Sequence, residues 1–107
     1  MGQGLKVQRG GAGGAFDVTT AEWFSIIRES SGGTAKSVDG YKVVMFGKSY
    51  CMYLVEEKVA FYAPGTTSGA IYQKLTEKTT VGNIIINPVN QTVHTTSSEH
   101  LYCWGFK

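Results

Sequence analysis

The chain has 107 residues, of which 42% are hydrophobic and 17% are charged. This length suits a single domain that can bury a hydrophobic core, and the composition excludes an intrinsically disordered protein. The formal net charge of +2 is too small to indicate nucleic acid or an anionic membrane as a partner. Abundant aromatic residues and glycine, combined with few charges, are typical of a sheet-rich protein.

The N-terminus and the two cysteines bear on the cellular compartment. No apolar run approaches the roughly 18 residues of a membrane helix, and residues 1–6 lack the apolar core of a secretory signal. Cys51 and Cys103 are too few for a disulfide scaffold, although adjacent strands would allow them to pair. We therefore expect a cytoplasmic protein with reduced thiols and no association with a membrane.

Residues 1–15 are rich in glycine, with four glycines between residues 10 and 14. Because glycine loses the most backbone entropy on ordering, we expect a flexible N-terminal arm here. Leu5 and Val7 flank Lys6, which leaves room for a short edge strand. We expect residues 16–107 to form one domain.

The first predicted element of that domain is a helix over residues 19–30. Thr19 and Glu22 have the spacing of a capping box, and Val18 and Trp23 have the spacing of a hydrophobic staple. An apolar stripe at helical spacing follows: Trp23, Phe24, Ile26 and Ile27. The Gly32-Gly33 pair is typical of a helix end.

The middle of the chain changes to a strand pattern. Residues 41–46 are β-branched and aromatic, and Gly47-Lys48 offers a tight turn. Strands are predicted to follow at 50–55 and 59–62, which gives an antiparallel meander. Pro64-Gly65 ends it.

Residues 68–78 fit two patterns. In a helix, Ser68 would cap and Ile71 and Leu75 would share one face, whereas in a strand Ile71, Gln73 and Leu75 would share a face. We favour the helix. Three further strands are then predicted, at 81–87, 91–96 and 100–106. The resulting fold class is α+β, with one or two helices packed on an antiparallel sheet of about five or six strands.

Two glycine motifs resemble phosphate-binding loops, but neither matches the full sequence pattern of such a loop. Gly47-Lys48-Ser49 lacks the earlier glycine of that loop, because position 42 is lysine, and a strand follows it instead of a helix. Gly11 and Gly13 begin a dinucleotide-binding pattern, but Phe16 occupies its last position. We expect a hairpin turn at the first motif and a flexible tail at the second.

Thiol or transition-metal chemistry would need Cys51, Cys103, His94 and His100. A regular final strand places Cys103 and His100 on opposite faces, and Cys51 shares a face with apolar neighbours. Free cysteine in such a pattern usually behaves as a small buried hydrophobe. No spacing typical of a zinc site is present. We therefore assign no catalytic residue, no metal ligand and no cofactor, and lean against an enzyme.

The aromatic residues are too many for so small a core. The final strand places His100, Tyr102, Trp104 and Phe106 on one face and Leu101 and Cys103 on the other. If Leu101 and Cys103 face the core, the aromatic face points outward and is a candidate binding surface, because Tyr and Trp are enriched at binding hot spots. If the aromatics face the core, they are ordinary packing, which is the commoner arrangement. Tyr41 and Tyr53 complete the predicted binding residues.

These observations favour a small non-enzymatic module that binds or inhibits another protein, with a phage or mobile element as one source to consider. It would act through the aromatic face or a sheet edge. One alternative is a small enzyme or ligand binder that uses cysteine and histidine in a pocket between helix and sheet. Another is a single-stranded nucleic-acid binder, although Lys42 and Tyr41 alternate onto opposite faces, so we do not expect nucleic acid. An exposed edge strand would also allow a homodimer.

Overall fold

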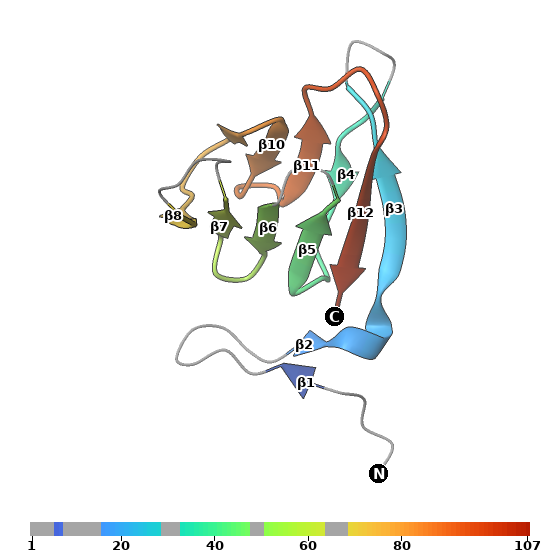
Figure 1. Ribbon diagram of the computed structural model, residues 1–107, viewed down its shortest axis with the longest axis vertical. Coiled ribbons are helices and arrows are strands. Elements are labelled where there is room, and N and C mark those ends of the chain that lie inside the picture. Colours follow the sequence, from blue (N-terminus) through green and yellow to red (C-terminus); the bar gives the residue numbers. More distant parts are fainter. Residues whose placement is uncertain (1–5, 8–15, 29–32, 48–50, 64–68) are drawn as a thin grey trace.

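The structure is a computed structural model that describes residues 6–7, 16–28, 33–47, 51–63 and 69–107. Within these residues the chain forms β-strands and one short 3-10 helix, η1 (Val18–Thr20) (Figure 1). The strands belong to antiparallel sheets. The predicted α+β class, with one or two helices packed on a sheet, is therefore wrong.

The larger sheet has six antiparallel strands. In spatial order these are β3 (Glu22–Ile26), β12 (Leu101–Phe106), β5 (Val43–Phe46), β6 (Cys51–Leu54), β7 (Val59–Tyr62) and β8 (Ile71–Lys74). Four of them, β5 to β8, follow one another in both sequence and space. The C-terminal strand β12 is inserted between β3 and β5, so it holds the two parts of the sheet together (Figure 1).

The smaller sheet has four strands, and a third sheet has two. The order in the four-stranded sheet is β4 (Lys36–Ser37), β11 (Thr92–Thr95), β10 (Ile84–Asn87) and β9 (Thr79–Val81). β1 (Lys6–Val7) pairs with β2 (Phe16–Asp17) beyond one end of the large sheet (Figure 1). The Asp17 backbone N–H donates to the carbonyl of Lys107 at 2.9 Å, which ties β2 to the C-terminus. The rest of the predicted flexible arm lies outside the described residues.

One hydrophobic core fills the space between the two larger sheets. The large sheet contributes buried side chains from alternating positions, among them Phe24, Val44, Phe46, Tyr53 and Leu101. The small sheet contributes Val81, Ile84, Ile86 and Val93. Each strand of the large sheet therefore has one face toward this core and one face away from it, and we call the second face the outer face.

The predicted helix 19–30 is replaced by η1 and β3. Asp17 caps η1, because its carboxylate accepts a hydrogen bond from the Thr19 backbone N–H at 2.9 Å. Glu22 does not close a capping box. Its carboxylate instead accepts from the Tyr41 hydroxyl at 2.7 Å and pairs with Lys107 at 3.0 Å, and these contacts, the Tyr41 bond first, lower the pKa of Glu22.

The apolar residues that suggested this helix alternate between exposed and buried positions, as they do in a strand. Phe24 and Ile26 are buried, whereas Trp23 between Glu22 and Phe24 is exposed. Four apolar residues within five positions satisfy both the helical and the strand period, and β-branched and aromatic residues pack well in a half-buried strand. Pairing of this segment with β12 along its length decides between them. Of the predicted helix end at residues 30–33, residues 30–32 lie outside the described residues.

The second predicted helix is also a strand. Residues 71–74 form β8, and Gln73 lies opposite Ala60 of β7. Leu75 follows the strand as a buried side chain, and its backbone N–H donates to the Lys58 carbonyl at 2.8 Å. Pairing with the edge of β7 supplies the hydrogen bonds that a short isolated helix would have had to make internally.

The predicted strands at 41–46, 50–55, 59–62, 91–96 and 100–106 correspond to β5, β6, β7, β11 and β12. The predicted strand 81–87 is two strands, because the chain reverses at Gly82-Asn83 between Val81 and its partner Ile84. Gly82 has a φ of 61°, which suits the first central residue of a type II′ hairpin turn. This turn separates β9 from β10.

Candidate binding face

Large apolar side chains form one row across the outer face of the six-stranded sheet. Each lies directly opposite the next in the strand register, so all point to the same side of the sheet. From β3 to β8 the row consists of Trp23, Trp104, Met45, Met52, Phe61 and Tyr72. We call it the outer row. At the usual spacing between strands it is about 24 Å long.

The outer row is open to solvent along most of its length. Trp104 is 44% exposed and Met45 is 43% exposed, Trp23, Phe61 and Tyr72 are exposed to a similar or greater extent, and Met52 is half-buried. Tyr102 widens the patch, since it is half-exposed and its ring stacks on Trp23 with centroids 5.7 Å apart. Single exposed apolar residues are ordinary, whereas a contiguous patch of them marks an interaction surface.

A shallow apolar cavity of about 390 Å³ lies over the middle of the outer row. Its lining includes Met45, Met52, Phe61 and Trp104. Gly47 lies at the same place, and a Cβ atom there would be 2.7 Å from the Tyr102 carbonyl oxygen. The absence of a side chain at Gly47 thus allows the close approach of β12 that frames the cavity.

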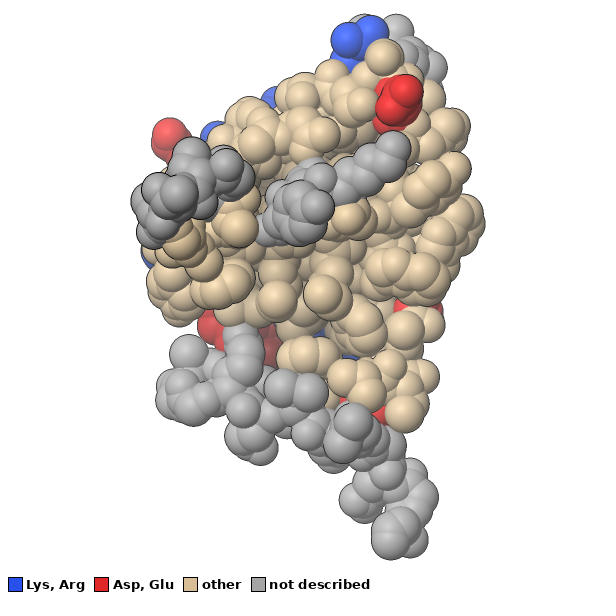
Figure 2. Space-filling view, viewed as in Figure 1, with Lys and Arg blue, Asp and Glu red and all other residues tan. Residues whose placement is uncertain are grey.

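Among the described residues, charged side chains lie at the margins of this face. Lys74 of the edge strand β8 lies opposite Val59, and its Nζ donates to the Glu57 carbonyl oxygen at 2.6 Å. Outside the grey atoms, Figure 2 shows coloured side chains only near the margins of the face. The outer row itself contains no ionisable group that is charged at neutral pH. Any ligand of this surface is therefore held by apolar and aromatic contacts.

The neighbouring row of the same face is covered. Three residues of this row are buried, and each lies two positions from a member of the outer row on the same strand: Val43 before Met45, Leu54 after Met52 and Val59 before Phe61. Phe106 packs against this second cluster together with Phe16, whose ring centroid lies 5.7 Å from that of Phe106. The outer face thus has one row of side chains that is buried and one row, the outer row, that is open to solvent.

The structure divides the predicted binding residues between both faces and one loop. Tyr102 and Trp104 point outward, while Leu101 and Cys103 are buried, so the less common of the two alternatives for this strand is the one found. Phe106 shares their face but is half-buried by Phe16. His100 is exposed and precedes β12, so it is not part of the strand.

Tyr41 and Tyr53 belong to the core side of the sheet. Tyr53 is completely buried, and its hydroxyl donates to the Gln91 side-chain oxygen at 2.6 Å. Tyr41 is half-buried, stacks on Phe24, and covers Gly105. Both rings have structural partners on that side, which places them apart from the outer row.

Sequence reasoning did not include Trp23, Met45, Met52, Phe61 and Tyr72 in the binding surface. Trp23 and Tyr72 were each assigned to a helix. Met45, Met52 and Phe61 belong to predicted strands whose relative register is not visible in the sequence. Alternation within β5 could have shown that Met45 points away from Val44 and Phe46. The alignment of all six strands, which makes single residues into a row, comes only from the pairing.

The two thiols are buried and unpaired. Cys103 and Cys51 both lie opposite Phe46, on either side of β5, so two strand spacings, about 10 Å, separate their backbones. This exceeds the reach of a disulfide, and both cysteines are free. Burial raises the pKa of each thiol to about 12, so the thiolate that a nucleophile requires is absent at neutral pH.

Two negative findings hold for the described ranges. No group of three or more histidine, cysteine, aspartate or glutamate side chains there could hold a metal ion. No helix in these ranges has the length and apolar character needed to cross a membrane.

We also compared the chain with protein-family models, with curated proteins and with solved structures, and found no match in any of the three.

Proposed function

We propose that this protein is a binding module that holds another protein against the outer row. The observation that carries the proposal is the alignment of large apolar side chains across all six strands of one sheet, most of them open to solvent. Keeping such side chains in water offers no gain in folding free energy, because the hydrophobic effect rewards only their removal from water.

The size of the patch fits a specific interface. Aromatic side chains carry about 200 Å² each, and the members of the outer row together with Tyr102 are about half exposed. The patch therefore offers on the order of 600 Å², close to the roughly 800 Å² that each partner buries in an interface of standard size. Met45 and Met52 at its centre are unbranched and can adjust their shape to a partner.

The chemistry of the surface defines the partner. Because the outer row lacks charge, a complementary surface is also uncharged and apolar, since a charged group buried here would lose its hydration without compensation. The cavity between Met45, Met52, Phe61 and Trp104 is suited to one protruding apolar side chain. We infer a partner protein that presents an apolar patch with such a side chain at its centre.

The two alternative functions have less support. Thiol chemistry would need a reactive cysteine, and both thiols are buried with raised pKa values. Binding of single-stranded nucleic acid needs cations beside the stacking aromatics, and the outer row has none. An inhibitory role, a cytoplasmic location and a phage or mobile-element origin remain predictions from the sequence.

Affinity capture with matched variants tests the proposal. The tagged protein, Trp104→Ser and Val89→Ser are each incubated with nuclease-treated lysate of the source organism. Val89 is the control because it is 75% exposed and lies in the turn after β10, away from the outer face. Each variant's thermal unfolding is measured first, so that loss of binding is not loss of folding.

The account expects one stoichiometric protein that is retained by the wild type and by Val89→Ser and lost with Trp104→Ser. Retention of that protein by Trp104→Ser would contradict the proposed surface. If no protein is captured and the wild type is instead dimeric by light scattering while Trp104→Ser is monomeric, the occupant is a second copy and the proposed partner is wrong.

A further inference from the structure

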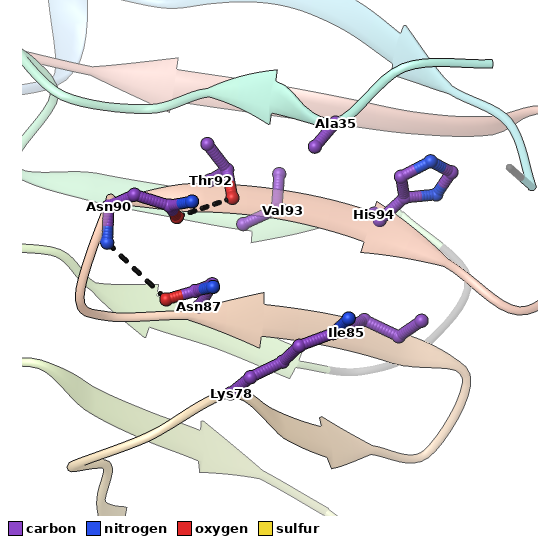
Figure 3. A pocket seen from close by; sticks show the side chains of 8 residues that line it. All are labelled: Ala35, Lys78, Ile85, Asn87, Asn90, Thr92, Val93 and His94. Atoms are coloured by element: carbon purple, nitrogen blue, oxygen red, sulfur yellow. Dashed lines mark hydrogen bonds between the residues drawn. The ribbon is translucent and has the colours of Figure 1, made fainter.

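The outer side of the small sheet has a separate hollow of about 160 Å³, lined by five polar residues and by Ala35, Ile85 and Val93. Figure 3 shows Asn87 at the end of β10, Thr92 and His94 on β11, Asn90 in the turn between them, and Lys78 just before β9. In the strand register Asn87 lies opposite Thr92, and Ile85 lies opposite His94. Side chains of two adjacent rows therefore surround this hollow, which lies on the other sheet from the outer row.

The amide of Asn87 is oriented by its own turn. Its side-chain oxygen accepts hydrogen bonds from the backbone N–H groups of Val89 at 2.9 Å and of Asn90 at 3.3 Å. Because both partners are donors, only the oxygen can occupy that position. The NH₂ group of Asn87 is consequently left on the other side of the amide, with two N–H donors that no described residue engages.

Asn90 repeats this arrangement across the hollow. Its side-chain oxygen accepts from the Thr92 hydroxyl at 2.7 Å (Figure 3). The oxygen of each asparagine is thus engaged by a neighbouring donor, and each NH₂ group remains as a donor. In this arrangement both amides offer N–H donors to a ligand.

His94 forms part of the wall of the hollow. The Thr95 backbone N–H donates to Nδ1 of His94 at 3.0 Å, and Nδ1 also lies 3.4 Å from the Thr95 carbonyl oxygen. His94 is only 7% exposed, and Nε2 has no hydrogen-bond partner among the described residues. A buried polar group without a partner is uncommon in folded proteins and calls for an explanation.

Lys78 gives the hollow its charge. Its side chain extends toward the same region from the start of β9 (Figure 3), and no carboxylate in the described ranges forms an ion pair with it. None of the residues that line the hollow is acidic. The lining therefore combines one positive charge with N–H donors from two further side chains, Asn87 and Asn90.

We propose that this hollow binds a small oxyanion, either a phosphate or a carboxylate group. An oxyanion presents several acceptor oxygens and a negative charge, which is the complement of an ammonium group and fixed N–H donors. Asn87, Asn90 and Lys78 form the binding set, and His94 forms part of the wall of the hollow.

The test is an NMR titration of the ¹⁵N-labelled full chain with sodium phosphate and, separately, with sodium acetate. Sodium chloride at matched ionic strength is the reference. The account expects saturable shifts of the Asn87 and Asn90 side-chain NH₂ signals with at least one of the two oxyanions and none with chloride. Saturation by phosphate alone or by acetate alone identifies which group the hollow accepts.

Three variants assign the effect to the proposed residues. Asn87→Asp keeps the oxygen that caps the turn and replaces the NH₂ donor with a second carboxylate oxygen, so it preserves the fold and repels an anion. Lys78→Gln removes the charge from the hollow, and Lys74→Gln removes one charge from β8 of the other sheet as the control. Because a hydrogen bond to a charged group contributes about 1.5–3 kcal/mol, Asn87→Asp and Lys78→Gln should each weaken binding about tenfold or more.

The proposal is overturned if neither oxyanion gives a saturable shift, or if Asn87→Asp binds as the wild type does. An equal loss with Lys74→Gln and Lys78→Gln would show only a response to net charge, and would also overturn it. These outcomes are independent of the outer row, so they do not bear on the proposed protein partner.

Discussion

Trp104 and Met45 lie directly opposite each other on β12 and β5, with 44% and 43% of their surfaces exposed. Their chain neighbours, Cys103, Val44 and Phe46, point the other way and are buried. Because successive side chains of a strand point to opposite faces, each of these two strands has one packed face and one open face.

Substitutions at two adjacent residues should differ sharply in their effect on stability. Met45→Ala removes a side chain that is 43% exposed, and we expect a loss of about 1 kcal/mol. Phe46→Ala leaves a cavity in the core between the sheets, and we expect a loss of about 3–5 kcal/mol. Urea unfolding of both variants measures the difference. Equal losses at the two positions would show that the faces of β5 are assigned wrongly.

The ring of Tyr41 leaves no room for a side chain at position 105, so only glycine fits there. A Cβ atom at position 105 would lie 2.6 Å from two ring carbons of Tyr41, and that ring is held by its stacking on Phe24 and its hydrogen bond to Glu22. Gly105→Ala should therefore cost about 1–3 kcal/mol, as overpacking does. In a Tyr41→Ala background the same substitution should cost much less, which a double-mutant cycle measures. Equal costs in both backgrounds would contradict the contact.

The sequence predicted the individual strands better than the arrangement of the sheets. β5, β6, β7, β11 and β12 have β-branched and aromatic patterns that identify a strand locally. The two predicted helices failed because a short amphipathic stretch fits either period, and only contact with β12 or β7 decides which one it adopts. Pairing partners distant in sequence, such as Trp23 and Trp104, leave no local signal.

The candidate surface was accessible to sequence reasoning only in part. Alternation in the last strand separated Tyr102 and Trp104 from Leu101 and Cys103, but it could not show which pair was buried. Tyr41 and Tyr53 were assigned to binding on residue type alone, and contacts with Gly105 and Gln91 place them on the core side. The outer row depends on the register of six strands, which is a property of the whole sheet.

Stability should fall as the pH rises above about 9. Burial raises the pKa of Cys51 and Cys103 from 9.0 to about 12, so between these values the unfolded chain releases two protons that the folded chain retains. Because the unfolded state then binds fewer protons, the free energy of unfolding decreases with pH, by on the order of 1 kcal/mol per pH unit for each thiol. Tyr53, whose pKa burial raises to about 12, adds to the decrease above pH 10.

Chemical denaturation at several pH values between neutral and about 10 measures this decrease. The double variant Cys51→Ala and Cys103→Ala keeps the tyrosines and should lose most of the slope between pH 9 and 10. A wild type with flat stability over that interval would contradict the burial of the thiols.

Both thiols should also resist alkylation in the folded protein. Cys51 and Cys103 are buried on the core side of the sheet, so a reagent reaches them only after the chain opens. Reaction with a thiol reagent in native buffer is expected to be slow, and to become fast in urea above the unfolding midpoint. Rapid modification of either thiol without denaturant would revive the alternative of a thiol enzyme.

Methionine oxidation tests the central claim most directly, because two of the three methionines, Met45 and Met52, lie in the outer row. Peroxide converts an accessible methionine to its sulfoxide, and mass spectrometry reads each site separately. In the complex captured by affinity, the account predicts slower oxidation of Met45 and Met52 than in the free protein, with Met1 as the internal reference. Equal rates at both sites, free and bound, would show that the partner binds elsewhere.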